Sequence, residues 1–463
     1  MSRFVAVGFA LLVLIRPSYA VDPPATFPPD LGTRPTGEDW PGFLGPRGDG
    51  KSAETGLDPD WKKSPPKLLW LRKLGTSYGM PSIARGRLIL CERIGDKART
   101  VCLNSETGKL LWTYEDETAY SDTLGYDNGP RCAPVIDGDR VYTFGADGVL
   151  TCLNVIDGKK LWRVDTEKEF HVVQNFFGVG ATPVVFGDLL IVQVGGSPAG
   201  TSVPAPDRLD AATPDGCCVV AFDKTTGKER YRVGDDLASY AGPTLARIDG
   251  KPTCFVFSRS GLLSFDPAAG KQRFFYPWRA DDLYSVNAAN PVVVGDEVLV
   301  SECYGPGASL LKAKGNEYEV LWKDKPGGIR TPKSLQTHWN TPVHHDGYVY
   351  GSSGRHSNNA ELRCVEWKTG KVMWSQKGLS RSSLTYLDGH FLTLTEYGDL
   401  IVVKADSTKY EPVSTFAAND KNTGERFLEY PAWAAPIVSH GLLYVRGKDR
   451  LACYEIIPET KAK

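Results

Sequence analysis

The stretch TGKLLW, Thr107–Trp112, decides the fold because the chain repeats it. Related stretches end at Trp162 (DGKKLW), Tyr231 (TGKERY), Phe274 (AGKQRF) and Trp374 (TGKVMW), and degraded copies end at Trp322 and Phe416. A second unit precedes each copy, as in PVVVGDEVLV at 291–300, and eight such starts occur along the chain. The period of about 40 to 60 residues is that of a β-propeller in which each repeat is one four-stranded blade.

Each repeat can be divided into four strands. In 291–300, two apolar runs flank a Gly-Asp turn and form strands A and B; GVLTCLN at 148–154 is a strand C. The TGK turn follows, where glycine supplies a positive φ, and strand D begins at the LLW motif. We expect the aromatic residue of strand D to pack between neighbouring blades.

The two ends of the repeat array complement each other. The last start, 435–456, lacks a strand D, whereas PKLLWLRKL at 66–74 is a strand D with no blade before it. We therefore predict an all-β fold: an eight-bladed β-propeller of four-stranded antiparallel blades over residues 65–457, with its ring closed by the N-terminal strand completing the last blade. A short tail, 458–463, follows.

The N-terminal residues predict export. A signal peptide over 1–20, cleaved near Ala20, is indicated by three features. They are Arg3, the apolar run 4–15 and the small residues of SYA at 18–20. We expect residues 21–64 to form a Pro-rich, extended segment in which DWPGF pins Trp40 against the propeller. No later run is long and apolar enough to span a membrane, so we expect a periplasmic or secreted protein. A net charge of −1 argues against nucleic acid as a partner.

The residues GPRGDGKS, 45–52, match the phosphate-binding loop pattern. That loop requires a buried strand before it and a helix starting at the lysine. Here Pro41 and Gly42 precede it, and Gly56 and Pro59 break the sequence after it. We therefore expect no nucleotide site.

The combination of P-x-V, G-x-L/V, a strand C ending in Asn or Asp, TGK and Trp resembles the pyrroloquinoline quinone (PQQ) repeat family across 66–456. In that family the Trp-bearing element is called the tryptophan-docking motif. The family includes quinoprotein alcohol and sugar dehydrogenases and the non-enzymatic, BamB-like subunit of the outer-membrane β-barrel assembly machinery. Together with DWPGFLGPRGDG at 39–50, the repeat is similar to exported propellers of planctomycete-type bacteria. The resemblance implies a fold, not one activity.

The loops divide between two faces. The A–B and C–D turns share a plain face and are minimal, whereas the D–A and B–C loops share a loop-rich face and are long. A ligand site should lie on the loop-rich face near the channel mouth. The candidate binding residues are Asn128, Arg131, Asn175, Asn287, Asn290, Glu302, Tyr304, His338, Trp339, Asn340, Arg355, His356, Arg381 and Trp433.

The sequence signals for a metal site and for a disulfide are weaker than those for the fold. Glu302, His338 and His356 are the best candidate ligands, but their spacing is not diagnostic, and we assign no metal. Cys217 and Cys218 resemble the vicinal disulfide of quinoprotein dehydrogenases, although here they open a strand. Whether these two are joined, or Cys132 pairs with Cys303, stays open.

Two functions remain. The favoured one is a rigid, exported binding platform that takes a protein, glycan or small-molecule ligand on its loop-rich face, with no cofactor assigned. The alternative is a PQQ- and Ca²⁺-dependent quinoprotein dehydrogenase, in which Glu302 with Asn287 or Asn290 holds the cation, Arg355 or Arg381 faces the quinone oxygens, and Trp339 or Trp433 forms the floor. No catalytic motif of that family is matched, and the chain has no haem-attachment sequence. The long insert 195–216 has a composition suited to a lid or a docking arm.

Overall fold

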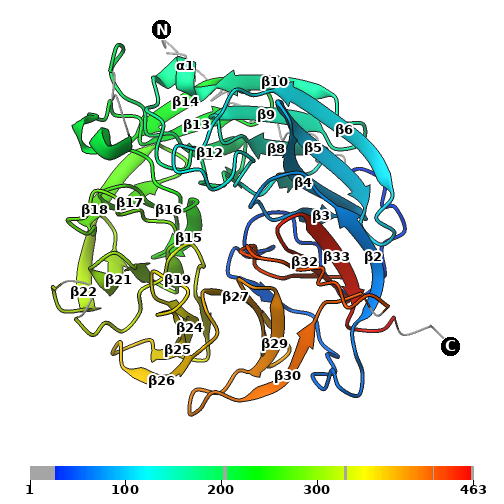
Figure 1. Cartoon of the computed structure of the whole chain (residues 1–463). Coiled ribbons are helices and arrows are strands. Elements are labelled where there is room, and N and C mark those ends of the chain that lie inside the picture. Colours follow the sequence, from blue (N-terminus) through cyan, green and yellow to red (C-terminus); the bar gives the residue numbers. More distant parts are fainter. Residues whose placement is uncertain (1–26, 202–205, 328–330, 421, 460–463) are drawn as a thin grey trace, which may run out of the picture.

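The computed structural model describes residues 27–201, 206–327, 331–420 and 422–459, so the predicted signal peptide lies outside the described residues. These residues form eight four-stranded antiparallel sheets, one of which gains a short fifth strand. Figure 1 shows the sheets arranged as blades around a central axis. The predicted eight-bladed propeller is confirmed.

The strands of the first four blades are short and regular. Blade 1 contains β3 (Ser82–Ala84), β4 (Arg87–Ile94), β5 (Lys97–Asn104) and β6 (Leu110–Glu117). Blade 2 contains β7 (Val135–Asp137), β8 (Arg140–Phe144), β9 (Val149–Asn154) and β10 (Lys160–Asp165). Blade 3 contains β11 (Val184–Phe186), β12 (Leu189–Gln193), β13 (Val219–Asp223) and β14 (Glu229–Val233). Blade 4 contains β15 (Thr244–Ile248), β16 (Lys251–Phe257), β17 (Gly261–Asp266) and β18 (Lys271–Pro277).

The remaining blades follow the same plan. Blade 5 contains β19 (Val292–Val294), β20 (Glu297–Glu302), β21 (Gly307–Lys314) and β22 (Glu317–Lys323). Blade 6 contains β23 (Val343–His345), β24 (Tyr348–Ser353), β25 (Glu361–Glu366) and β26 (Val372–Lys377). Blade 7 contains β27 (Ser382–Leu387), β28 (His390–Thr395), β29 (Asp399–Lys404) and β30 (Pro412–Ala417). Blade 8 contains β31 (Ile437–Ser439), β32 (Leu442–Arg446), β33 (Arg450–Glu455) and, from the N-terminal side, β2 (Lys67–Lys73).

The ring closes through strands from opposite ends of the chain. Strand β2 pairs antiparallel with β33, with Lys67 opposite Glu455 and Lys73 opposite Arg450. Figure 1 shows the blue β2 beside the red β33. The predicted closure is confirmed, and it leaves blade 8 with the same four-strand order as the others.

A tryptophan on strand D of one blade docks onto the next blade. Trp112, at the end of the TGKLLW motif, donates from Nε1 to the carbonyl of Val155, 3.0 Å away. Its ring lies over Gly158, where an added Cβ would come within 2.5 Å of a ring carbon. The glycine of DGK therefore supplies both a positive φ and room for the tryptophan of the preceding blade.

The same contact recurs around the ring, as the repeated motif predicts. Its other members donate to a carbonyl just after strand C of the next blade: Trp70 to Ser105 at 2.9 Å, Trp162 to Lys224 at 3.1 Å, Tyr231 to Pro267 at 2.7 Å, Trp322 to Trp367 at 2.8 Å and Trp374 to Asp406 at 2.9 Å. Trp70 lies on β2, so this contact also joins the closing strand to blade 1.

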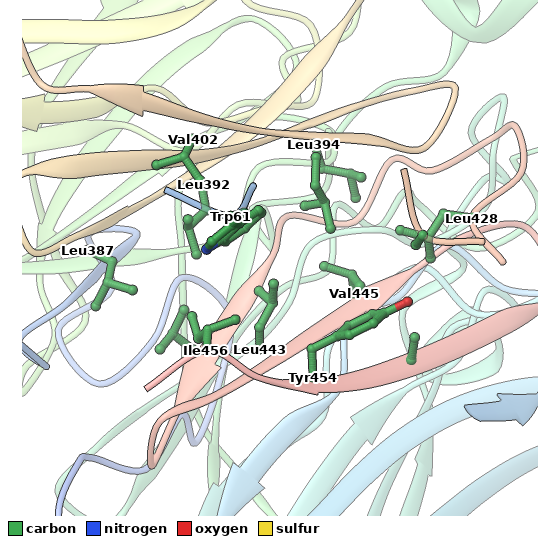
Figure 2. Packing of buried hydrophobic residues seen from close by; sticks show 14 of the residues in the cluster. Trp61, Leu387, Leu392, Leu394, Val402, Leu428, Leu443, Val445, Tyr454 and Ile456 are labelled. Carbon is green, nitrogen blue, oxygen red and sulfur yellow. The ribbon is translucent and has the colours of Figure 1, made fainter. Parts of the chain in front are cut away.

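The N-terminal segment, residues 27–64, lies against the plain face. Trp40 is 1% exposed and packs in the cluster between blades 8 and 1. Strand β1 (Lys51–Ser52) runs parallel to β27, and Trp61 inserts between blades 7 and 8. Figure 2 shows Trp61 among Leu387, Leu392, Val402 and Leu443. The plain face is therefore covered over several blades.

The phosphate-loop match has a structural explanation. Lys51 begins a strand, not a helix. The N–H groups of Gly45, Gly48 and Gly50 donate to carbonyls inside the same loop, at 3.1, 3.1 and 2.9 Å. Amides that are bonded within the loop are not directed at a phosphate, so the match reflects turn chemistry.

Helices contribute little to the described chain. They comprise α1 (Thr166–Phe170) and the 3-10 helix η1 (Pro206–Ala211). Within the described ranges, no helix has the length and apolar character needed to cross a membrane.

Replacing Trp112 by Ala removes a buried ring and a hydrogen bond between blades 1 and 2. We expect the free energy of unfolding to fall by about 3–5 kcal/mol, measured by denaturant titration. The matched control is Leu111→Ala on the same strand, where the side chain is 40% exposed and the expected change is within about 0.5 kcal/mol. Equal losses in both variants would contradict the docking role.

His440 fastens the N-terminal segment to blade 8. Its Nδ1 lies 2.9 Å from the carbonyl oxygen of Arg34 and its Nε2 lies 3.1 Å from Oδ1 of Asp39. Burial favours the neutral ring, but the hydrogen bond to Asp39 and the Asp39 charge outweigh it and raise the pKa of His440 above its ordinary value of 6.5. The protonated ring can donate to both acceptors.

We expect this attachment to weaken as the pH rises. A raised pKa in the folded state contributes stability that is complete below pH 6.5 and is lost as the pH passes through the folded value. Proteolysis of the N-terminal segment should therefore accelerate in the native protein as the pH rises above 6.5. In His440→Gln this pH dependence should disappear; an unchanged profile in that variant would refute the assignment.

Candidate ligand-binding site

A cavity of about 330 Å³ lies within the ring and is lined by the loop-rich face. Its walls combine aromatic rings, three arginines and small polar side chains, and its lining includes two residues from the N-terminal segment. The candidate residues among them are Arg131, Tyr304, His338, Trp339, Asn340, Arg355, His356, Arg381 and Trp433. The structure thus brings these side chains from blades 1, 5, 6, 7 and 8 to one cavity.

Arg381 and two tryptophans form one wall. Residue Arg381 immediately precedes β27, and its guanidinium lies 4.5 Å from the ring centre of Trp339 and 5.5 Å from that of Trp433. The two rings are 4.6 Å apart. Glu396, whose side chain is 0% exposed, accepts from Nη2 of Arg381 at 2.7 Å and from Nε1 of Trp433 at 3.2 Å. Although burial opposes the charge, the hydrogen bonds from Arg381 and Ser357 and the Arg381 charge lower the pKa of Glu396, so the pair is ionised.

Arg355 and Tyr304 form the adjoining wall. The guanidinium of Arg355 lies 4.3 Å from the centre of the Tyr304 ring and pairs with Asp282 at 3.2 Å. The hydroxyl of Tyr304 is 3.3 Å from Nε2 of His338. Burial, with the charges of Arg381 and Arg355, lowers the pKa of His338 to about 3. The imidazole is therefore neutral at physiological pH.

Arg131 approaches the cavity from the loop between blades 1 and 2. It pairs with Asp122 and donates to the carbonyls of Gly129 and Asp127 at 2.6 and 2.7 Å. Its guanidinium lies 5.7 Å from the ring centre of Tyr78, another lining residue. All three arginines thus have a carboxylate partner, yet none of the described residues that line the cavity is an Asp or a Glu.

Three buried polar atoms of the lining residues have no hydrogen-bond partner among the described protein groups. They are Nδ1 of His338, Nε1 of Trp339 and Oδ1 of Asn340. The indole nitrogen is only a donor, whereas a neutral imidazole can donate or accept. Buried polar groups normally have partners, so these atoms offer binding capacity to water or a ligand.

Other candidates do not line the cavity. Asn287 is 0% exposed and donates from Nδ2 to the carbonyl of Ser258 at 2.7 Å, and Asn290 accepts from the N–H of Gly242 at 2.7 Å. Oδ1 of Asn128 accepts from the N–H of Asp122 at 2.7 Å. Asn175 faces a second cavity between blades 2 and 3. The hydrogen bonds of Asn287, Asn290 and Asn128 shape loops.

Glu302 is likewise directed into the protein. It is 1% exposed; Oε1 accepts from Ser285 at 2.7 Å, and Oε2 accepts from the N–H groups of Tyr304 and Gly305 at 2.9 and 3.1 Å. Burial raises its pKa to about 7. Both oxygens are therefore used by protein donors, although a titrating carboxyl beside a cavity is often functional.

The residues around the cavity do not provide the ligands that a calcium-bound quinone needs. Such a site needs carboxylate and amide oxygens that converge on an open position. The donors expected from the sequence, Glu302, Asn287 and Asn290, lie behind the cavity wall instead. Glu302, His338 and His356 do not converge either, and no group of three or more His, Cys, Asp or Glu in the described chain is arranged to hold a metal ion.

The cysteine pair considered from the sequence is not joined. All ten cysteines lie in described parts of the chain and are free and buried. Cys217 packs with Phe170 and Val194, whereas Cys218 packs with Val256 and Leu263 in another cluster. Both residues directly precede β13, and their side chains enter different clusters. Cys132 and Cys303 are not bonded to each other.

The insert between β12 and β13 is docked in its described part. Leu209 is 3% exposed and packs with Phe176, Leu237 and Val286. Asp210 accepts from Arg259 at 2.5 Å and from Arg279 at 2.9 Å. These contacts hold η1 against the loop-rich face.

Several lining residues were missed in the sequence. Phe43 and Leu44 come from the N-terminal segment; the others include Tyr78, Met80, Leu124, Tyr126, Phe176, Phe177, Tyr240 and Tyr284. Most lie in the long D–A loops, where the concentration of aromatic residues was an available signal. Tyr126 and Tyr284 are 57% and 43% exposed.

Solved structures with the same fold have little sequence identity to this chain. BamB from Moraxella catarrhalis aligns with a TM-score of 0.55 and 13% identity, covering 86% of this chain and 99% of that protein. A quinohemoprotein alcohol dehydrogenase from Comamonas testosteroni aligns with a TM-score of 0.60 and 12% identity, covering 92% and 82%. The computationally designed Ika8 protein aligns with a TM-score of 0.52 and 10% identity, covering 84% and 98%. These similarities establish the fold alone.

Sequence comparison gives the family. No curated protein sequence matches the chain. A family model described as outer membrane protein assembly factor BamB matches residues 60–203 and 179–376, which together span more than half of the chain. The protein therefore belongs to the BamB family of PQQ-like β-propellers.

Proposed function

We propose that this protein is a binding propeller whose central cavity takes a small, planar aromatic ligand. The observation that carries the proposal is the lining: aromatic rings, three guanidinium groups and unpartnered polar atoms surround a space of about 330 Å³. That volume lies at the lower end of ordinary small-molecule sites. Trp339, Trp433 and Tyr304 supply faces on which a flat ring can stack.

The polar groups favour a ligand with acceptor oxygens. Trp339 Nε1 and the cavity-facing arginines are donors, and their charge partners lie behind the wall. Because no described lining residue is a carboxylate, a cationic ligand would find no charge partner on the surface of the cavity. We propose that the ligand bears a carboxylate, sulfonate or carbonyl group beside its ring.

The dehydrogenase alternative is less well supported. A PQQ- and Ca²⁺-dependent enzyme needs oxygen ligands for the cation and a carboxylate base near the substrate. Glu302 is capped by Ser285 and two N–H groups, and Asp122, Asp282 and Glu396 are paired with arginines. We therefore favour binding over catalysis.

We also propose that the mature protein is exported, beginning near Val21. The residues that motivate this proposal are the apolar run 4–15 and the small residues at 18–20. The description of the family as an outer membrane assembly factor is consistent with a location beyond the inner membrane.

Two dyes with the same ring system test the ligand chemistry. N-phenyl-1-naphthylamine is uncharged, and 8-anilinonaphthalene-1-sulfonate adds one sulfonate; both fluoresce when they leave water. We expect both to bind, with tighter binding of the sulfonate. Trp433→Ala should weaken both by about tenfold or more, because it removes a stacking surface. Arg355→Gln should remove only the preference for the sulfonate.

A control variant distinguishes dye binding in the cavity from dye binding to exposed apolar surface. Leu161 on the outer strand β10 is 44% exposed, and Leu161→Ala should leave the binding of both dyes unchanged. If neither dye binds, or if Trp433→Ala binds both dyes like the native protein, the cavity is not the binding site.

A calorimetric titration with PQQ, with and without Ca²⁺, tests the alternative. We expect any binding of PQQ to be independent of Ca²⁺ and expect no reduction of an artificial acceptor with alcohols or sugars. Tight binding that requires Ca²⁺, accompanied by acceptor reduction, would reverse the choice of function. Glu302→Gln would then be expected to abolish that Ca²⁺ dependence.

A further inference from the structure

The central cavity is bounded by a segment that lies outside the eight repeats. Phe43 and Leu44 line it together with Met80 and Leu384. Their segment lies on the plain face, whereas Arg355 and Arg381 approach from the loop-rich face. The two ends of the cavity therefore differ: guanidinium groups lie toward the mouth, and apolar side chains lie at the opposite end.

The segment crosses the ring at the plain-face end. Trp40 exchanges backbone hydrogen bonds with Ile83 of blade 1 at 2.8 and 2.7 Å. The carbonyl of Pro41 accepts from Ile136 of blade 2 at 2.8 Å. On the return, the carbonyl of Gly50 accepts from Tyr386 of blade 7 at 3.0 Å. These partners belong to the innermost strands β3, β7 and β27, so the loop 41–50 spans the channel between them.

The loop is held in a conformation that its sequence does not favour. Leu44 has a φ of +62°, a region that an ordinary side chain rarely adopts. The following Gly45 lies against the Trp40 ring, where an added Cβ would come within 3.0 Å. Leu44 is nevertheless 5% exposed and contributes to the cavity lining. Backbone strain of this kind persists only where the surrounding contacts enforce it and is frequent at binding sites.

We infer that Phe43 and Leu44 are the specificity-determining floor of the cavity. They make the channel a blind pocket, and they set how long a ligand can be when its anionic group lies beside the arginines. This inference rests on the proposed function. It assigns to the N-terminal segment a part in recognition that the repeats do not supply.

A series of 4-alkylbenzoates, from ethyl to octyl, tests the floor by displacement of 8-anilinonaphthalene-1-sulfonate. In the native protein, affinity should rise with chain length until the tail meets Phe43 and should then fall. In Phe43→Ala the optimum should move to a longer chain. The matched control is Phe27→Ala, in the same segment but 67% exposed, which should keep the native optimum. An identical optimum in native protein and Phe43→Ala would overturn the inference.

A second variant adds thiol labelling, a readout that does not itself need ligand binding, to the dye assay. Phe43→Cys places a thiol at the floor, while all ten native cysteines are buried. We expect 5,5′-dithiobis(2-nitrobenzoate) to modify the introduced thiol and thereby block dye binding, whereas labelled Phe27→Cys should still bind dye. An inert thiol in Phe43→Cys, or labelling that leaves dye binding intact, would overturn the inference that Phe43 forms the floor of the cavity. If native protein binds neither dye nor benzoate, the proposed function fails and the labelling of Phe43→Cys alone decides the floor.

Discussion

The stacking of an aromatic ring from one blade on the TGK glycine of the next is the contact on which the architecture depends. At Trp112 and Gly158 it combines ring burial, a hydrogen bond to the Val155 carbonyl and a backbone conformation that glycine adopts without strain. The contact recurs at Trp70, Trp162, Tyr231 and Trp322, where it sets neighbouring blades against each other. Trp70 on the closing strand β2 makes the same contact with blade 1. The junction that closes the ring is therefore stabilised in the same way as the junctions between repeats.

The closed ring of blades explains why a site forms although no single repeat contains one. Minimal turns occupy the plain face, which leaves the loop-rich face free to carry long loops. Loops around the whole ring contribute side chains, and the ring brings Tyr304, His338, Arg381 and Trp433 together although they are far apart in sequence. The N-terminal segment completes the arrangement by crossing the other end of the channel.

Most of the fold could be predicted from the sequence because strand, turn and docking residues recur with one period. The predicted strands at 291–300 and 148–154 correspond to β19, β20 and β9, and the incomplete ends correspond to blade 8. The buried cysteines at 102, 152, 364 and 453 likewise share one position in strand C. Local periodicity is sufficient for such features.

The site could be predicted only in part, because loop residues follow no period. Both Asn287 and His338 lie in long D–A loops, but the amide of Asn287 donates to backbone carbonyls whereas His338 faces the cavity. That difference depends on loop geometry, which composition does not encode. Phe43 was missed because its segment has no repeat. The sequence also left open a bond between Cys217 and Cys218, whose side chains the structure places in separate clusters.

The most direct test is a crystal structure of the protein bound to 8-anilinonaphthalene-1-sulfonate. The account predicts that the ring system lies against Trp339 and Trp433 above Phe43, with the sulfonate directed at Arg355 or Arg381. A dye bound on the outer strands, or in the second cavity between blades 2 and 3 while the central cavity holds none, would contradict it.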